Sequence, residues 1–169
     1  EPMPSRLVGH LQTSLAIAAA LTQLHALGIF HVDLNPMNIL FRTERGRPII
    51  RIVDFESSYE VARHAHGEYY NPPTTPGYSA PEVAHQPPDG RADLYSLGAV
   101  LYTMLAGFGW TWGSEVGAAI AHDASLDADL KAMLEQAVAP EPARRYTSVA
   151  SFHEALAAYL EQIWPGRSW

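Results

Sequence analysis

Cysteine is absent from the 169 residues of this chain. Disulfide bonds and thiolate metal sites are therefore excluded, and the composition suits a reducing, cytoplasmic compartment. Only 11 basic residues stand against 18 acidic ones, which gives a formal charge of −7. Because no basic cluster interrupts this acidity, we expect no nucleic-acid partner. No signal-peptide pattern is present, and the longest apolar stretch, about residues 97–110, is shorter than the roughly 20 residues that span a bilayer, so we expect no membrane partner.

What the chain does contain is typical of one globular domain. Hydrophobic residues make up 47% of it and charged residues 17%, and a chain of this length can bury one substantial core. Apolar residues recur at helical spacing over 7–27, 126–138 and 148–163, and Ser125 is placed to cap the second of these helices. The segment 91–106 is apolar on nearly every side, which predicts a central helix that is buried all round. The expected fold class is mainly α.

A small β-hairpin is predicted between the first two helical segments. Ile39–Phe41 and Ile49–Val53 are apolar and β-branched, and a polar turn separates them. Such a hairpin brings Asn38, at the start of one strand, close to Asp54, at the end of the other. Residues 55–90 contain six prolines and are expected to form a long ordered loop.

The most informative stretch is the loop His31–Asn38, between the first helix and the hairpin. It carries an acid, Asp33, and an amide, Asn38, and Asp54 supplies a second acid. Phosphoryl transfer needs such a set, because one carboxylate orients or deprotonates the attacking hydroxyl while an amide and a carboxylate hold Mg²⁺. Taken alone, the loop is equally compatible with a polar turn in which Asp33 and Asn38 satisfy backbone groups. The acid that follows the strand favours the functional interpretation.

Four motifs in this chain resemble those of the protein kinases. His31–Asn38 is similar to the catalytic loop H-R-D-L-x-x-x-N. Asp54–Glu56 is similar to the Asp-Phe-Gly metal-binding motif, with a glutamate in place of the glycine. Thr75–Glu82 is similar to the segment T-P-x-Y-x-A-P-E that ends the activation loop, and Asp93–Gly98 is similar to the D-x-x-S-x-G start of a central buried helix. The order agrees with the family, so the resemblance spans nearly the whole chain.

The resemblance implies a role for each candidate residue. Asp33 is the expected base, and Asn35 and Thr75 are polar members of the same catalytic set. Asn38 and Asp54 are the expected Mg²⁺ ligands, so they also bind the ATP cofactor, and Leu40 contacts it. A buried carboxylate needs a partner, and Glu82 is expected to pair with Arg145. Structural support is expected from His31, Phe55, Glu82, Asp93 and Arg145, with Asp93 accepting backbone N–H groups of the catalytic loop.

Three residues depart from the family pattern. Val32 replaces the arginine that pairs with a phosphorylated activation loop, so we expect no activation by that phosphate. Asn35 replaces the lysine that contacts the transferred phosphate, and an amide supplies no positive charge to the transition state. Glu56 resists backbone conformations that glycine permits, which weighs against a flip of this segment.

A complete protein kinase also has a β-rich N-lobe, with a Gly-rich loop and a lysine paired to a glutamate. Nothing before residue 7 supplies these, and the one lysine, Lys131, lies on a late helix. Residues 1–169 are therefore expected to form a C-lobe alone, whether as part of a longer chain or as a natural half-kinase. The expected partners are an N-lobe, from the same longer chain or from another protein, and a protein substrate or binding partner.

Three functions follow from these features. The first is the C-lobe of a Ser/Thr-type protein kinase, which transfers phosphate from Mg-ATP to a protein hydroxyl and is weak or inactive in isolation. The retained Asp33, Asn38 and Asp54 favour it, since a scaffold needs none of them. The second is a pseudokinase that binds a protein, which Asn35 and the absent N-lobe favour. The third is a small-molecule kinase, which the protein-kinase segment Thr75–Glu82 disfavours.

Overall fold

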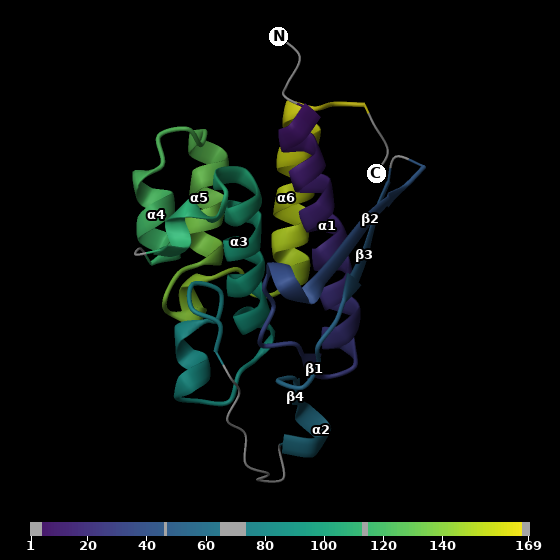
Figure 1. The fold of residues 1–169 in the computed structure, drawn as a ribbon, viewed down its shortest axis with the longest axis vertical. Helices are drawn as coiled ribbons and strands as arrows, with labels where there is room; N and C mark the ends of the chain where they lie inside the picture. The colour runs from purple at the N-terminus through teal and green to yellow at the C-terminus, as the bar shows by residue number, and fades with distance from the viewer. Residues whose placement is uncertain (1–4, 46, 65–73, 113–114, 167–169) are drawn as a thin grey trace.

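The computed structural model describes residues 5–45, 47–64, 74–112 and 115–166, and it is mainly helical, as predicted (Figure 1). The helices are α1 (Ser5–Ala26), α2 (Val61–His64), α3 (Gly90–Ala106), α4 (Val116–His122), α5 (Ala128–Ala137) and α6 (Val149–Ile163). The short 3-10 helices are η1 (Pro36–Asn38), η2 (Pro81–Ala84), η3 (Phe108–Trp112) and η4 (Pro142–Arg144). The strands are β1 (Ile29–Phe30), β2 (Ile39–Glu44), β3 (Arg47–Ile52) and β4 (Tyr59–Glu60).

Helix α3 is the centre of the core. Every residue from Ala92 to Thr103 is buried, and α1, α5 and α6 all pack against this helix. In Figure 1, α3 lies between the pair α4 and α5 on one side and the pair α1 and α6 on the other. The helix begins after Asp89, whose side chain accepts a hydrogen bond from the Arg91 N–H. The prediction of a buried central helix over 91–106 is confirmed, with the helix starting one residue earlier.

Helix α1 feeds the loop that carries the candidate acid. By length and composition alone, this helix could cross a membrane, and it is a longer segment than the apolar stretch 97–110. The side chains of Leu11, Ile17 and Leu21 have no exposed surface, and α1 packs against α3, α6 and β3. These are the contacts of a core helix.

The prediction that Ser125 caps helix α5 is wrong. Asp127, not Ser125, precedes α5, and its side chain accepts hydrogen bonds from the N–H groups of Asp129 and Leu130. Ser125 instead donates both its N–H and its hydroxyl to Asp123. A carboxylate can accept two backbone N–H groups at once, so Asp127 satisfies this helix end better than a hydroxyl would.

The predicted hairpin is present and is longer than expected. Strands β2 and β3 pair antiparallel, with Ile39 opposite Ile52 and Glu44 opposite Arg47. A second, two-residue ladder joins β1 to β4, so the expected long loop over 55–90 contains a strand and the short helices α2 and η2. Residues 65–73 of that loop lie outside the described part of the chain.

Gly98 is required where α3 meets the end of α5. A Cβ at this position would lie 2.8 Å from Cγ1 of Val138 and 3.0 Å from Cβ of Ala137. Gly98→Ala should therefore lower the free energy of unfolding by about 1–3 kcal/mol, the usual cost of overpacking a core. Gly9 in α1 is the matched control, because a Cβ there meets nothing within 4 Å. Gly9→Ala should stabilise the protein by about 0.5–1 kcal/mol. Urea unfolding of both variants measures this difference, and equal effects would contradict the close approach at Gly98.

Candidate active site

One buried carboxylate holds the loop His31–Asn38 in place. Asp93, in the first turn of α3, has no exposed surface. It accepts hydrogen bonds from the backbone N–H of His31 at 2.8 Å and of Val32 at 2.7 Å, and His25 Nε2 lies 2.8 Å from it. Val32 has a φ of 70°, a conformation that β-branched residues strongly disfavour. The hydrogen bond to Asp93 offsets this strain and fixes the backbone turn just before Asp33.

The half-buried Asp33 side chain is the meeting point of the polar residues around it. Thr75 donates its hydroxyl to Asp33 Oδ1 at 2.5 Å. The Asn38 amide donates to the Asp33 carbonyl at 2.9 Å and approaches Oδ2 at 3.4 Å. The Asn35 amide donates to the same carbonyl at 3.0 Å and lies 3.4 Å from the Thr75 hydroxyl. The residues predicted as a catalytic set, Asp33, Asn35 and Thr75, thus lie in contact with one another, with Asn38 beside them.

Asp54 lies at the end of the hairpin, next to the same loop. The N–H of Val53 donates to the carbonyl of Asn38 at 3.0 Å, and His31 Nε2 donates to the carbonyl of Val53 at 3.0 Å. Asp54 itself has a φ of 65° and an exposed side chain. Phe55 follows, with its ring 5.0 Å from that of His31. His31 and Phe55 therefore hold the backbone that leads into and out of Asp54.

The oxygen donors at this end of the hairpin fit a Mg²⁺ ion. Within the described residues, Asn38 Oδ1 and the Asp54 carboxylate have no hydrogen-bond or ion-pair partner, and hard oxygen ligands are those that Mg²⁺ takes. Among the described residues, no group of three or more His, Asp or Glu side chains gathers in a way that could hold a metal, at this site or at another. With so few protein ligands, the ion would keep waters or take substrate phosphates. The roles of Asn38 and Asp54 as ligands remain a prediction.

Glu82 and Arg145 form the ion pair that the sequence predicted. The contact is bidentate, with N···O distances of 2.7 and 2.8 Å, and the two side chains are 9% and 0% exposed. The guanidinium of Arg145 also donates to three backbone carbonyls, and it lies 4.9 Å from the centre of the Tyr95 ring. The pair joins η2 to η4 and fastens the segment that carries Thr75 to the core.

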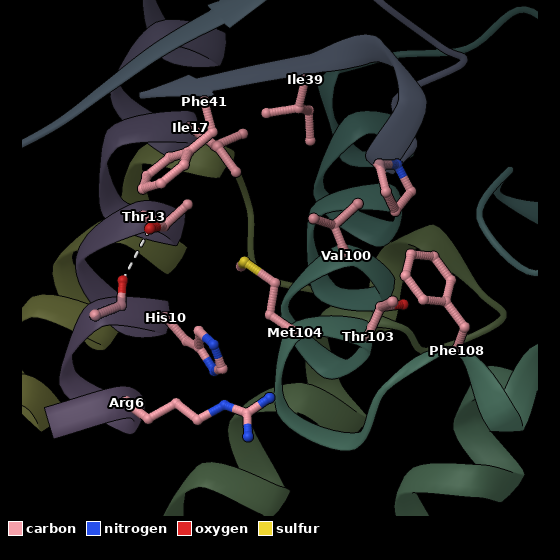
Figure 2. A pocket seen from close by; sticks show the side chains of 12 residues that line it. Arg6, His10, Thr13, Ile17, Ile39, Phe41, Val100, Thr103, Met104 and Phe108 are labelled. Carbon is pink, nitrogen blue, oxygen red and sulfur yellow. Dashed lines mark hydrogen bonds between the residues drawn. The ribbon is translucent and has the colours of Figure 1, made fainter. Parts of the chain in front are cut away.

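A cavity lies apart from the Asp33 cluster. It has a volume of about 500 Å³ and lies between α1, α3 and strand β2 (Figure 2). Arg6 and His10 line its α1 end, and burial together with the Arg6 charge lowers the pKa of His10. Phe41 and Met104 line the apolar remainder. Leu40, predicted to contact a cofactor, belongs to the same strand and is 54% exposed.

This fold and site belong to a known class. Residues 10–159 match the protein kinase domain family, so the chain belongs to the protein kinases. The matched residues include the His31–Asn38 loop, the segment Thr75–Glu82 and the central helix α3.

Individual members of the family show how far the similarity extends. The chain is 34% identical over 161 residues to the serine/threonine-protein kinase PknJ of Mycobacterium tuberculosis, which covers 85% of this chain and 27% of that protein. It is 34% identical over 168 residues to the serine/threonine-protein kinase Pkn1 of Myxococcus xanthus, covering 86% and 23%. Human ribosomal protein S6 kinase alpha-2 is 44% identical over 94 residues, covering 54% and 13%. The chain thus spans only about a quarter or less of the length of these relatives.

Two residues that support the site were not predicted from the sequence. His25 contacts Asp93 from the last turn of α1, and Tyr95 lies against Arg145. Only their positions in the sequence could have indicated these roles: His25 stands six residues before His31, and Tyr95 lies on the same helix as Asp93. Neither signal distinguishes them from ordinary core residues.

The Glu82–Arg145 pair predicts a large effect on stability. Glu82→Ala leaves the Arg145 charge buried without a carboxylate, so the free energy of unfolding should fall by about 3–5 kcal/mol. The exposed pair of Arg42 and Glu44, with side chains 61% and 53% exposed, provides the control. Glu44→Ala should cost less than about 1 kcal/mol. Chemical denaturation measures both changes, and a Glu82→Ala loss as small as that of the control would refute a buried role for the pair.

The anchoring role of Asp93 can be tested on the loop itself. Asp93→Asn replaces one acceptor oxygen with an amino group, so one of the N–H groups of His31 and Val32 loses its partner, at about 1–3 kcal/mol. Amide hydrogen exchange of these two residues should accelerate accordingly. Asp89→Asn on the same helix is the control, because asparagine caps a helix as well as aspartate. Unchanged exchange at His31 and Val32 in Asp93→Asn would mean that the loop is held by something else.

Proposed function

We propose that residues 1–169 form the C-lobe of a Ser/Thr-type protein kinase that transfers a phosphoryl group from Mg-ATP to a protein hydroxyl. The observation that carries the proposal is the environment of Asp33. Its Oδ1 accepts a hydrogen bond from Thr75, while its Oδ2 has only the long 3.4 Å contact with Asn38. One oxygen is thus used to orient the carboxylate, and the other remains open to a substrate hydroxyl.

The proposed chemistry follows from that asymmetry. Asp33 Oδ2 accepts the proton of the serine or threonine hydroxyl as the hydroxyl oxygen bonds to the γ-phosphorus and the bond to the ADP oxygen breaks. Thr75 fixes the carboxylate through its hydroxyl, and Asn35 holds the Asp33 backbone carbonyl, so that the substrate hydroxyl is held for in-line attack. Asn38 and Asp54 would hold Mg²⁺, which supplies neutralisation of phosphate charge when bound. Leu40 would offer an apolar surface to the adenine ring.

We further propose that an N-lobe, from the same longer chain or from another protein, covers the face around β2. Leu40 and Phe41 are 54% and 55% exposed, and the 500 Å³ cavity lies beneath the same strand. An apolar surface of this kind favours a covering partner. Without it, the chain has no Gly-rich loop or paired lysine for the phosphates, so the isolated chain should bind Mg-ATP weakly and turn over negligibly.

A pseudokinase that binds a protein is the second candidate. The neutral side chain of Asn35 favours it, because the site contributes no cation to the transferred phosphate, and each missing electrostatic contact of this type can cost about 10²–10³ in rate. A small-molecule kinase is the third, and the match to the protein kinase domain through Thr75–Glu82 weighs against it.

Asp33→Asn separates the first two candidates. In a full-length parent protein with an N-lobe, this change should lower Mg²⁺-dependent phosphate transfer by at least about 10²-fold, since general-base groups typically contribute 10²–10⁴. Chelation of Mg²⁺ should abolish transfer in the unchanged protein. Asp129→Asn, on the exposed first turn of α5, should leave transfer unchanged. Radiolabelled phosphate incorporation into protein acceptors is the measurement. Absence of transfer across a broad acceptor panel would favour the pseudokinase.

A further inference from the structure

One face of the β2–β3 hairpin is turned away from the core. The antiparallel register places Leu40 opposite Arg51 and Arg42 opposite Ile49, and directly opposed side chains lie on the same face of a sheet. The other face, which includes Ile39, packs its isoleucines against the core. In Figure 1 the hairpin runs alongside α1, and its turn projects beyond that helix. We call the four outward residues, Leu40, Arg42, Ile49 and Arg51, the hairpin face.

The hairpin is basic in an otherwise acidic chain. Four of the 11 basic residues fall within residues 42–51, against a single acid, Glu44, although the chain as a whole carries a charge of −7. The four arginines are never adjacent in the sequence, so they form no run there, and it is the pairing of the two strands that gathers them. On the hairpin face, Arg42 and Arg51 stand diagonally across from each other, a separation of about 7–8 Å.

Both of these arginines are available to an anionic partner. Their side chains are exposed, and among the residues that the structure describes Arg51 has no hydrogen-bond or ion-pair partner. Arg42 pairs with Glu44 at 2.6 Å, and both side chains of that pair are more than half exposed. An exposed pair of this kind is weak, so an incoming carboxylate can take the place of Glu44.

A hollow of about 160 Å³ opens on the hairpin face. Leu40, Phe41, Arg42, Ile49 and Arg51 line it, and Leu40 is 54% exposed. Apolar side chains and guanidinium groups therefore share one small depression. A purely apolar partner would cover both charges without supplying a counterion, which is costly, and a polyanion without apolar groups would leave the leucine and the isoleucine uncovered. The lining fits a ligand that carries carboxylates next to apolar side chains.

An extended polypeptide matches this spacing. Alternate side chains of a strand share one face, and they recur about every 6.6 Å, which is twice the rise per residue. That period is close to the separation of Arg42 and Arg51 across the diagonal. Two acidic residues at alternate positions can therefore meet one arginine each, while an apolar residue two positions further along covers Leu40 or Ile49.

We propose that the hairpin face is a docking surface for an acidic, amphipathic segment of the protein that this chain acts on or binds. The surface recruits that partner and takes no part in chemistry, because none of its residues belongs to the Asp33 cluster. A kinase substrate and the binding partner of a pseudokinase would dock in the same way, so the proposal goes beyond the proposed kinase function. The N-lobe proposed above would cover β2 from the side of Phe41 and the 500 Å³ cavity, and Leu40 is where the two surfaces meet.

The test measures phosphorylation of designed peptides by the full-length parent protein. Each peptide joins one acceptor serine, through a flexible glycine linker, to a docking tract. The glutamate tract has leucine, glutamate, glutamate and leucine at alternate positions with alanine between them, and the lysine tract has lysine in place of glutamate. The glutamate tract should give a KM lower by at least about tenfold than the lysine tract. The value of kcat should be the same for both, because the docking contacts are equal in the ground state and the transition state.

Charge reversal identifies the surface that reads the tract. The double variant Arg42→Glu, Arg51→Glu should transfer the KM advantage from the glutamate tract to the lysine tract, a reversal that a loss of folding cannot produce. Arg144→Glu is the matched control, because it reverses a similarly exposed arginine on η4 (75% exposed). This control should leave the preference for the glutamate tract unchanged.

The outcomes separate this proposal from the kinase function. Asp33-dependent transfer with an equal or inverted preference between the tracts, or with a preference that the double variant does not change, overturns the docking surface alone. If no peptide is phosphorylated, the kinase function fails, and fluorescence anisotropy of the two labelled tracts with the same variants decides about docking. A labelled oligouridylate that binds as tightly as the glutamate tract, and that the double variant no longer binds, would identify a general polyanion site and overturn the proposal.

Discussion

The buried carboxylate of Asp93 is the constraint on which the site depends. A charge without exposed surface is tolerated only when donors surround it. Here the donors come from the end of α1, through His25, and from the backbone of the loop that follows, at His31 and Val32. The core helix α3 and the candidate catalytic loop are thereby held at a fixed separation. Val32 can keep its left-handed backbone, and Asp33 emerges half-buried within reach of Thr75.

Periodicity and motif order were sufficient to predict much of this arrangement. The long apolar segments gave α1, α3, α5 and α6 to within two residues at each end, because many buried side chains specify each of them. The hairpin also followed, since a polar turn between β-branched runs is a strong constraint, whereas the Glu82–Arg145 pair was implied by the family resemblance. The proximity of Asp33, Asn35 and Thr75 matches what the family resemblance implied, whereas their chemical roles remain predictions.

The remaining features of the structure have no local sequence pattern that predicts them. Strands β1 and β4 have two residues each, too few for any periodicity, and only tertiary pairing defines them. The choice of Asp127 over Ser125 as a cap depends on where the chain turns, which neighbouring helices decide. The positive φ values of Val32 and Asp54 could not be predicted from the sequence. Valine disfavours that conformation, and aspartate, although it adopts it more often than most residues, does so at few of its positions. The contact of His25 with Asp93 likewise exists only after α1 and α3 have packed.

The site as a whole depends on contacts between residues that lie far apart in the sequence. The hydrogen bond from His31 to Asp93 joins residues 62 positions apart in the chain, and that from Thr75 to Asp33 spans 42. Closing such long loops costs entropy before any contact compensates for it, so non-local contacts form later than helices do. The helices α1, α3 and α6 can form locally, whereas the geometry at Asp33 exists only once these loops have closed. Competence for chemistry would therefore depend on the tertiary closure of the chain and not on its helix content.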